Sequence, residues 1–235
     1  MNPERGIALV MVILFTAFLS AIGMGLALAV FMDRLATGNM AGSVAMLYAA
    51  DAGIELAAHE LAQVNDWSTV LSGAQQSHVT DGAPIGVRAL PGGGAVDLTA
   101  STNQLNCGKS TTCTNAQMNA NSKERPWGVN NPRWRLFAYA PMQQFAQLQR
   151  PVPCYLAVWL ADDAREQDGD PSTDEPLSGN PGYGIVRVHA ETYGFAGVRR
   201  AIEAELSRVC PGGGDGGCQP GIRVQSWQEL RQVLP

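Results

Sequence analysis

The chain is poor in the residues and motifs that carry most enzyme chemistry. It has only three histidines in 235 residues, His59, His78 and His189, and they are scattered. It has no Gly-x-Ser-x-Gly, His-Glu-x-x-His or Walker A sequence. These absences count against a serine hydrolase, a zinc protease and a P-loop nucleotidase, and we expect no enzymatic activity.

The chain also lacks an excess of positive charge. Its 16 Lys and Arg side chains are outnumbered by 21 Asp and Glu, which gives a formal net charge of −5. A basic surface is what attracts nucleic acid non-specifically, so this balance counts against nucleic-acid binding.

Charge is absent altogether between Arg5 and Asp33. A polar leader, residues 1–6, runs directly into the apolar segment 7–32. A helix over that segment would be roughly 39 Å long, enough to cross a bilayer core of about 30 Å. It is also longer than the core of about 7–15 residues in an ordinary signal peptide. We therefore predict a transmembrane helix whose flanking charges slightly favour a cytoplasmic N-terminus.

The helical pattern continues beyond Asp33 and changes character. Over 33–64 apolar side chains recur at three- and four-residue steps, which predicts an amphipathic helix with one buried stripe. The stripe comprises Leu47, Ala50, Ile54, Ala57, Leu61 and Val64. Asp51, Glu55 and His59 follow one another at four-residue steps on another face, which we interpret as solvated rather than metal-binding because one histidine and two carboxylates are a thin ligand set.

Residues 65–235 have the pattern of a β-rich head. Residues 67–131 are rich in Gly, Ser, Thr, Asn and Gln. Over the whole of 65–235, six segments have the pattern of strands. These are 85–90, 95–98, 134–140, 154–160, 184–193 and 198–206. The last two predict a hairpin, and the continuously apolar 154–160 predicts a strand buried on both faces. A helix followed by an antiparallel sheet gives the α+β class. In the tail 207–235, the capping-box spacing of Ser226 and Glu229 predicts a short final helix.

The five cysteines indicate an oxidising compartment in a chain with a membrane signal. Cys107 and Cys113 close a short loop, as do Cys210 and Cys218, so we predict these two disulfides, although spacing alone does not fix the connectivity. Cys154 lies in the apolar strand 154–160 and is expected to be a buried free thiol.

One loop, 162–175, is strongly acidic. Calcium takes six to eight oxygen ligands, and closely spaced carboxylates supply them. The candidate calcium ligands are Asp162, Asp163, Asp168, Asp170 and Asp174. The spacing is not that of an EF-hand, and a solvated acidic loop is the favoured interpretation over a calcium-ordered one.

Three stretches together resemble the PilX-type minor pilins of type IV pili. Arg5-Gly6-Ile7 resembles a prepilin processing site, and Tyr48-Ala-Ala-Asp-Ala-Gly-Ile-Glu55 resembles the corresponding family segment with Asp51 in place of a glutamate. Residues 158–204 carry a looser likeness: Val-Trp-Leu-Ala-Asp-Asp, then Asp-Gly-Asp-Pro, then Gly-x-x-Arg-Arg-x-Ile-Glu-Ala. The resemblance implies a pilin-like fold, cleavage after Gly6 by a prepilin peptidase, a mature chain that begins at Ile7, and N-methylation of that residue.

The resemblance also implies partners and a location. The precursor would sit in the inner membrane and the mature chain in a pilus fibre at the cell surface, with other minor pilins, the major pilin and a large tip adhesin as partners. Common pilins have glutamate at the fifth mature position, where this chain has Met11. An unpaired ion in an apolar interior is costly, so a subunit unable to neutralise a neighbour's amine is best placed at the fibre tip. The candidate functional residues of the assembly helix are Met11, Asp51 and Glu55.

Two alternatives stay open. One is a GspK-type pseudopilin of type II secretion, a family that this chain also resembles in lacking the acid. The absence of the large helical insertion usual in that family favours the pilus. The other is a membrane-anchored adhesive module in which residues 67–131 contact a surface.

Overall fold

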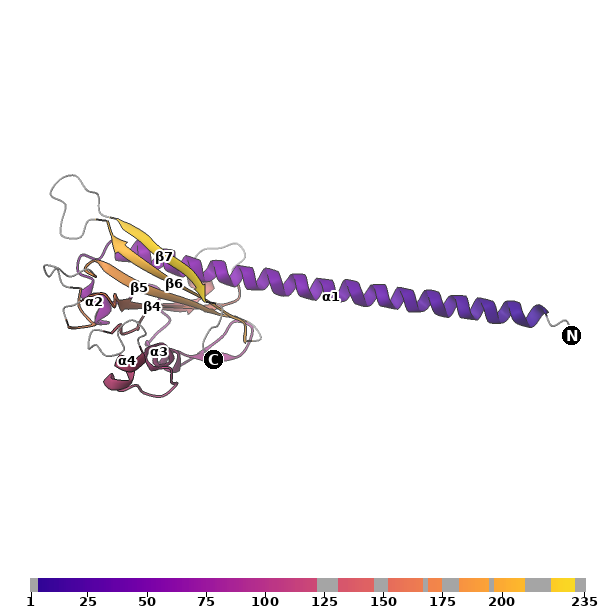
Figure 1. Cartoon of the computed structure of the whole chain (residues 1–235), viewed down its shortest axis with the longest axis horizontal. Coiled ribbons are helices and arrows are strands. Elements are labelled where there is room, and N and C mark those ends of the chain that lie inside the picture. The colour runs from indigo at the N-terminus through magenta and orange to yellow at the C-terminus, as the bar shows by residue number, and fades with distance from the viewer. Residues whose placement is uncertain are drawn as a thin grey trace. The chain divides into compact units, whose positions relative to one another are not determined.

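The computed structural model describes residues 4–121, 131–145, 152–166, 169–174, 182–194, 197–209 and 221–230 (Figure 1). The chain divides into two compact units, Met1–Val44 and Ala45–Pro235. The first is helical throughout its described part. The second holds the end of the same helix and a five-stranded antiparallel sheet, so the class is α+β, as predicted.

Helix α1 spans Glu4–Leu61, 58 residues without a proline. Proline is the residue that most disfavours a helix interior, and alanine, leucine and methionine, which are frequent here, favour it. The predicted transmembrane and amphipathic segments are therefore parts of one helix, which ends three residues before the predicted boundary at position 64. The indole Nε1 of Trp67 donates to the carbonyl oxygen of Leu61 at 3.0 Å and so satisfies a backbone group that the helix end exposes.

Five strands follow one another across the main sheet in chain order. They are β3 (Arg135–Pro141), β4 (Tyr155–Asp162), β5 (Ile185–Tyr193), β6 (Arg199–Arg208) and β7 (Ile222–Leu230). All pairings are antiparallel. The predicted hairpin is confirmed as β5–β6, and β4 is buried along its whole length, as its continuous apolar run indicated.

The two faces of the sheet have different cores. On one face the α1 side chains Ala50, Ile54, Ala57 and Leu61 pack with even-numbered residues of β4, β5 and β6, together with helix α2 (Ser68–Leu71). The apolar stripe predicted for α1 is confirmed, with Leu47 and Val64 partly buried at its margins. On the other face Val96 and Leu98 pack with Trp159 and Tyr193.

The polar region 67–131 contains more helix than the sequence interpretation allowed. The predicted strands form a small two-stranded sheet, β1 (Val87–Ala89) and β2 (Ala95–Asp97), but Leu98 begins helix α3 (Leu98–Cys107), and helix α4 (Asn115–Asn121) follows. Asp97 caps α3 by accepting from the amides of Thr99 and Ala100, and Gly108 ends it with a φ of 69°.

The predicted final helix is wrong: Ser226 and Glu229 lie in strand β7. The edge of β6 offers a continuous row of backbone partners, and pairing with it satisfies more groups than one short helical turn would. Side-chain contacts add to this, since Glu229 lies opposite Ile202 and its carboxylate is 3.7 Å from the guanidinium of Arg200.

Candidate functional site

The first half of α1 presents an apolar surface to its surroundings. Ile7, Met11 and Ile22 are 62%, 66% and 45% exposed, and large apolar side chains remain exposed as far as Val44. By length and composition this helix could cross a membrane or act as a signal sequence. Exposed apolar area on this scale is unfavourable in water, so the segment favours an apolar environment.

In the second unit the polar face of α1 meets the sheet's last strand. Glu55 and His59 are exposed, as expected for a solvated face, whereas Asp51 is half-buried. The indole Nε1 of Trp227 in β7 donates to Asp51 Oδ1 at 2.8 Å. Asp51 therefore contributes to the attachment of β7 to α1, a role that helical periodicity alone does not indicate.

Gly53 explains part of the Tyr48–Glu55 stretch. A Cβ at this position would lie 3.0 Å from a methyl carbon of Val158 and 3.1 Å from one of Leu156 in β4. The glycine lets the helix approach the sheet closely. The sequence interpretation used this residue only as part of a resemblance, and the structure gives it a packing reason.

The acidic loop is more buried than a solvated loop would be. Asp162, Asp163, Glu166 and Asp174 are 0–6% exposed, whereas Asp170 is exposed. The favoured interpretation of a solvated loop is therefore wrong for these four residues. Internal hydrogen bonds hold two of them in place: Asp163 Oδ2 accepts from Arg165 Nε at 2.8 Å, and Asp174 Oδ1 accepts from the amide of Gly184 at 2.7 Å.

These carboxylates do not form a metal centre in the described part of the chain. No group of three His, Cys, Asp or Glu side chains there is placed to hold a metal ion. Asp168, one of the candidate calcium ligands, and Glu175 lie outside the described residues.

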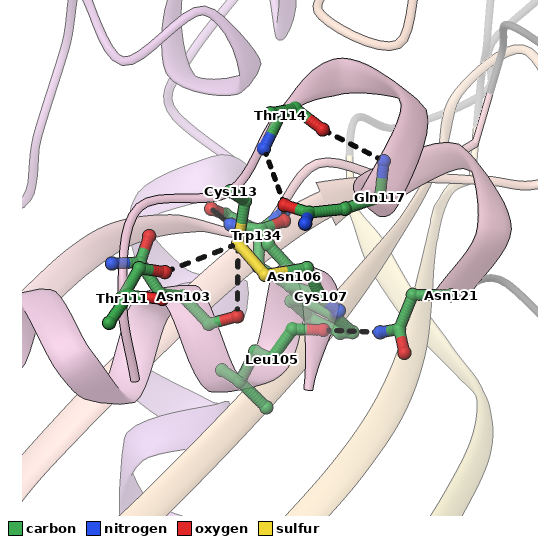
Figure 2. Close-up of a disulfide and its surroundings, with 10 residues drawn as sticks. All are labelled: Asn103, Leu105, Asn106, Cys107, Thr111, Cys113, Thr114, Gln117, Asn121 and Trp134. Atoms are coloured by element: carbon green, nitrogen blue, oxygen red, sulfur yellow. Dashed lines mark hydrogen bonds between the residues drawn. A yellow bond between two sulfur atoms is a disulfide. The ribbon is translucent and has the colours of Figure 1, made fainter. Parts of the chain in front are cut away.

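The disulfide Cys107–Cys113 is present, as predicted (Figure 2). It joins the end of α3 to the loop before α4, where Thr114 and Gln117 form a reciprocal capping box: the amide of Thr114 donates to Gln117 Oε1, and the amide of Gln117 donates to Thr114 Oγ1. Closing a loop of this length contributes about 2 kcal/mol in the chain-entropy model. The predicted partners Cys210 and Cys218 lie outside the described residues.

Cys154 is a buried free thiol, as expected. Burial raises its pKa to about 11, so it is protonated at neutral pH and is a poor nucleophile.

Side-chain hydrogen bonds also attach the α3–α4 region to the sheet. The side-chain amide of Asn106 pairs with the backbone of Trp134 through two hydrogen bonds, of 3.0 and 2.8 Å, and Trp159 Nε1 donates to Thr102 Oγ1 at 2.8 Å. Asn121 Nδ2 reaches back to the carbonyl oxygen of Leu105. The polar composition of 67–131 thus supports a docked structure held by side-chain hydrogen bonds.

A charged cluster lies on the sheet face that α3 covers. His189 is 2% exposed, and its Nδ1 lies 3.2 Å from Glu203 Oε1 while its Nε2 lies 3.7 Å from Glu191 Oε2. The indoles of Trp134 and Trp159 contact the imidazole edge-to-face. Arg187 pairs with Glu203 at 3.2 Å.

The cluster shifts two pKa values in opposite directions. Burial lowers the pKa of His189, but the nearby carboxylates of Glu191 and Glu203 outweigh it, so the pKa lies above its ordinary 6.5. Burial raises the pKa of Glu203, and contacts with His189 and Arg187 outweigh that in turn, so its pKa lies below the ordinary value.

The sequence interpretation counted His189 only as one of three scattered histidines and missed this cluster. The signal was the hairpin register. Once β5 and β6 pair, His189 lies directly opposite Glu203, and Glu191 is on the same face two residues along.

The comparisons with known proteins leave the family open. No protein-family model, curated protein or solved structure matches this chain. A long apolar N-terminal helix whose end packs on an antiparallel sheet is a pilin-like architecture, and that is the level at which the chain is identified.

Proposed function

We propose that the chain is a minor pilin of a type IV pilus. It would be made as a precursor anchored in the inner membrane, cut after Gly6, and incorporated near the fibre tip, where it helps to initiate assembly. The observation that carries this proposal is the contrast within α1, which is exposed and apolar in its first half and packed on its own sheet in its second.

A helix of this kind suits two successive environments. In the precursor, lipid covers the apolar side chains of 7–32. In a fibre, the same side chains would pack against equivalent helices of other subunits while the sheet unit remains folded. A signal sequence that is removed would need no such continuation into a folded unit.

Met11 supports a position at the tip. A carboxylate at this place could neutralise the N-terminal amine of a neighbour, and methionine cannot. The partners in this proposal are other minor pilins, the major pilin, the prepilin peptidase and a large tip adhesin.

Processing tests the proposal directly. Fibres sheared from cells that express the tagged chain should contain it with Ile7 as the first residue. Gly6→Ala should accumulate the uncut precursor in the membrane. Gly25→Ala is the matched control, because a Cβ there meets nothing within 4 Å, and it should be processed normally. A chain in fibres that begins at Met1, or no chain in fibres at all, would contradict the proposal.

A pseudopilin of type II secretion is the second candidate. That family usually carries a large helical insertion, and the observation in its favour is that region 67–121 contains two helices, α3 of 10 residues and α4 of 7. Deleting the pilus assembly platform or the secretion platform, each in turn, tells the two apart: only the platform that the chain serves should be required for its appearance outside the membrane.

A further inference from the structure

A cavity of about 260 Å³ lies within the second unit, between the sheet and the β2–α3 segment. Its floor includes His189, Glu191 and Tyr193 of β5 and Arg199 and Glu203 of β6, and Leu105 of α3 and Leu230 of β7 contribute apolar wall. It lies just below the usual size range of small-molecule sites, which suits a ligand of few atoms.

The floor of this cavity holds two buried polar atoms without a hydrogen bond. Among the residues that the structure describes, neither His189 Nε2 nor Glu191 Oε1 makes a hydrogen bond, although both side chains are more than nine-tenths buried. The other oxygen of Glu191 accepts from the hydroxyl of Tyr193 at 2.8 Å. Leaving a buried carboxylate oxygen unpaired is costly, so a ligand that donates to Glu191 Oε1 would be favoured there.

The other charged side chains that line the cavity already have partners, so Glu191 is the acceptor that is open to a ligand. Glu203 already faces His189 and Arg187 at 3.2 Å each. Asp97 Oδ1 accepts from two backbone amides of α3. Arg199 stands 3.9 Å from Glu191 Oε1, beyond hydrogen-bond length, with its guanidinium over the ring of Tyr193. With Glu203 and Asp97 engaged in this way, Glu191 is the lining carboxylate that favours a cation.

We propose that this cavity binds a small primary ammonium compound with a short alkyl chain. The ammonium group donates to Glu191 Oε1, and the alkyl chain lies against Leu105 and Leu230. The amine can belong to a free molecule or to a lysine side chain, since both present the same group. This proposal rests on the cavity alone and stands or falls independently of the pilin assignment.

Calorimetric titration of the full-length protein in detergent micelles tests it. We expect n-butylammonium to bind and n-butanol, which has the same chain without the charge, to bind roughly tenfold more weakly or worse, as a charge-assisted hydrogen bond requires. Nα-acetyl-lysine amide distinguishes the two sources: binding of the free amine alone indicates a small molecule, and binding of both indicates access for lysine. Either result supports the proposal.

Glu191→Gln should weaken n-butylammonium binding by roughly tenfold or more. Glu205→Gln is the matched control: it removes a carboxylate of β6 that is 31% exposed and does not line the cavity, and it should bind like the parent protein. If Glu191→Gln fails to fold, the ammonium–alcohol comparison on the parent protein decides alone. Equal binding of amine and alcohol, no binding of either, or equal loss in both variants would overturn the proposal.

Discussion

The two halves of helix α1 use similar apolar side chains in opposite ways. Ile22, in the first unit, is 45% exposed, whereas Ile54, in the second, is 2% exposed and packs with β-strand side chains. Residues 7–32 contain no ionisable side chain, while the second half carries Asp51, Glu55 and His59 on one face. Apolar content alone therefore does not determine what a helix packs against. The arrangement of polar residues around the helix determines it.

The largest expected effect comes from the matched pair Ile54→Ala and Ile22→Ala. Ile54→Ala removes buried methyl groups from the sheet core and should lower the free energy of unfolding of the second unit by about 2–5 kcal/mol. Ile22→Ala should leave that unfolding unchanged, because its side chain is outside that core. Urea titration followed by tryptophan fluorescence measures both. Equal losses in the two variants would break the comparison.

Met11→Glu introduces an ionisable group into residues 7–32, which contain none. A carboxylate costs about 2.5–3.5 kcal/mol at the centre of a membrane helix and less near the interface, where Met11 is expected. The variant should therefore still insert. If Met11 marks a tip subunit, the new acid would let the chain enter the shaft, and immunogold label should spread from fibre ends along their length. Parent label already scattered along the shaft would rule out the tip position.

Gly53→Ala and Gly42→Ala each add one methyl group to α1, the first where the helix packs on the sheet and the second in the exposed half. Their effects on stability should differ. In Gly53→Ala the added Cβ crowds Val158 and Leu156, at a cost of about 1–3 kcal/mol that the better helix propensity of alanine only partly offsets. In Gly42→Ala the Cβ meets nothing within 4 Å, so only the gain in propensity remains. A lower thermal midpoint for the first variant and not for the second is the expected result, and calorimetry in micelles measures it.

pH should act on the second unit and not on residues 7–32. The raised pKa of His189 contributes stability that is complete below its ordinary value of 6.5 and is lost as pH rises through the folded-state pKa. The lowered pKa of Glu203 contributes stability that is present above its ordinary value of 4.5 and is lost as pH falls through the folded-state pKa. The thermal midpoint should therefore decline on both sides, and His189→Gln should flatten the alkaline decline. An unchanged alkaline decline in that variant would show that another group causes it.

Much of the fold could be predicted because its signals are local. The apolar stripe of α1 and the continuous run of β4 follow directly from side-chain periodicity. The final strand could not be predicted in this way: Ser226 and Glu229 have capping spacing, but pairing with β6 overrides it. Helix α3 did have a local signal, Asp97 before it and Gly108 after it, which the polar composition of the region concealed.

Some residues of the candidate site could likewise be predicted from local sequence, and others could not. Cys107 and Cys113 are six residues apart, so the short loop between them indicated their pairing, although spacing alone did not fix it. The burial of Asp162 and Asp163 could not, since the folded loop sets the groups that donate to them, the amide of Asp163 and the side chain of Arg165. His189, Glu191 and Glu203 come together only through the strand register of the hairpin.

The central claim is that the first half of α1 packs in lipid while the second packs on its own sheet. Thiol accessibility in intact membranes tests it most directly, with Ile22→Cys, Ala52→Cys and Ala57→Cys compared against the parent chain. Ala52 is exposed and Ala57 is fully buried in the second unit. A membrane-impermeant maleimide should label Ala52→Cys alone, and denaturation in detergent should expose all three. Labelling of Ile22→Cys as complete as that of Ala52→Cys, before the membrane is dissolved, would contradict the claim.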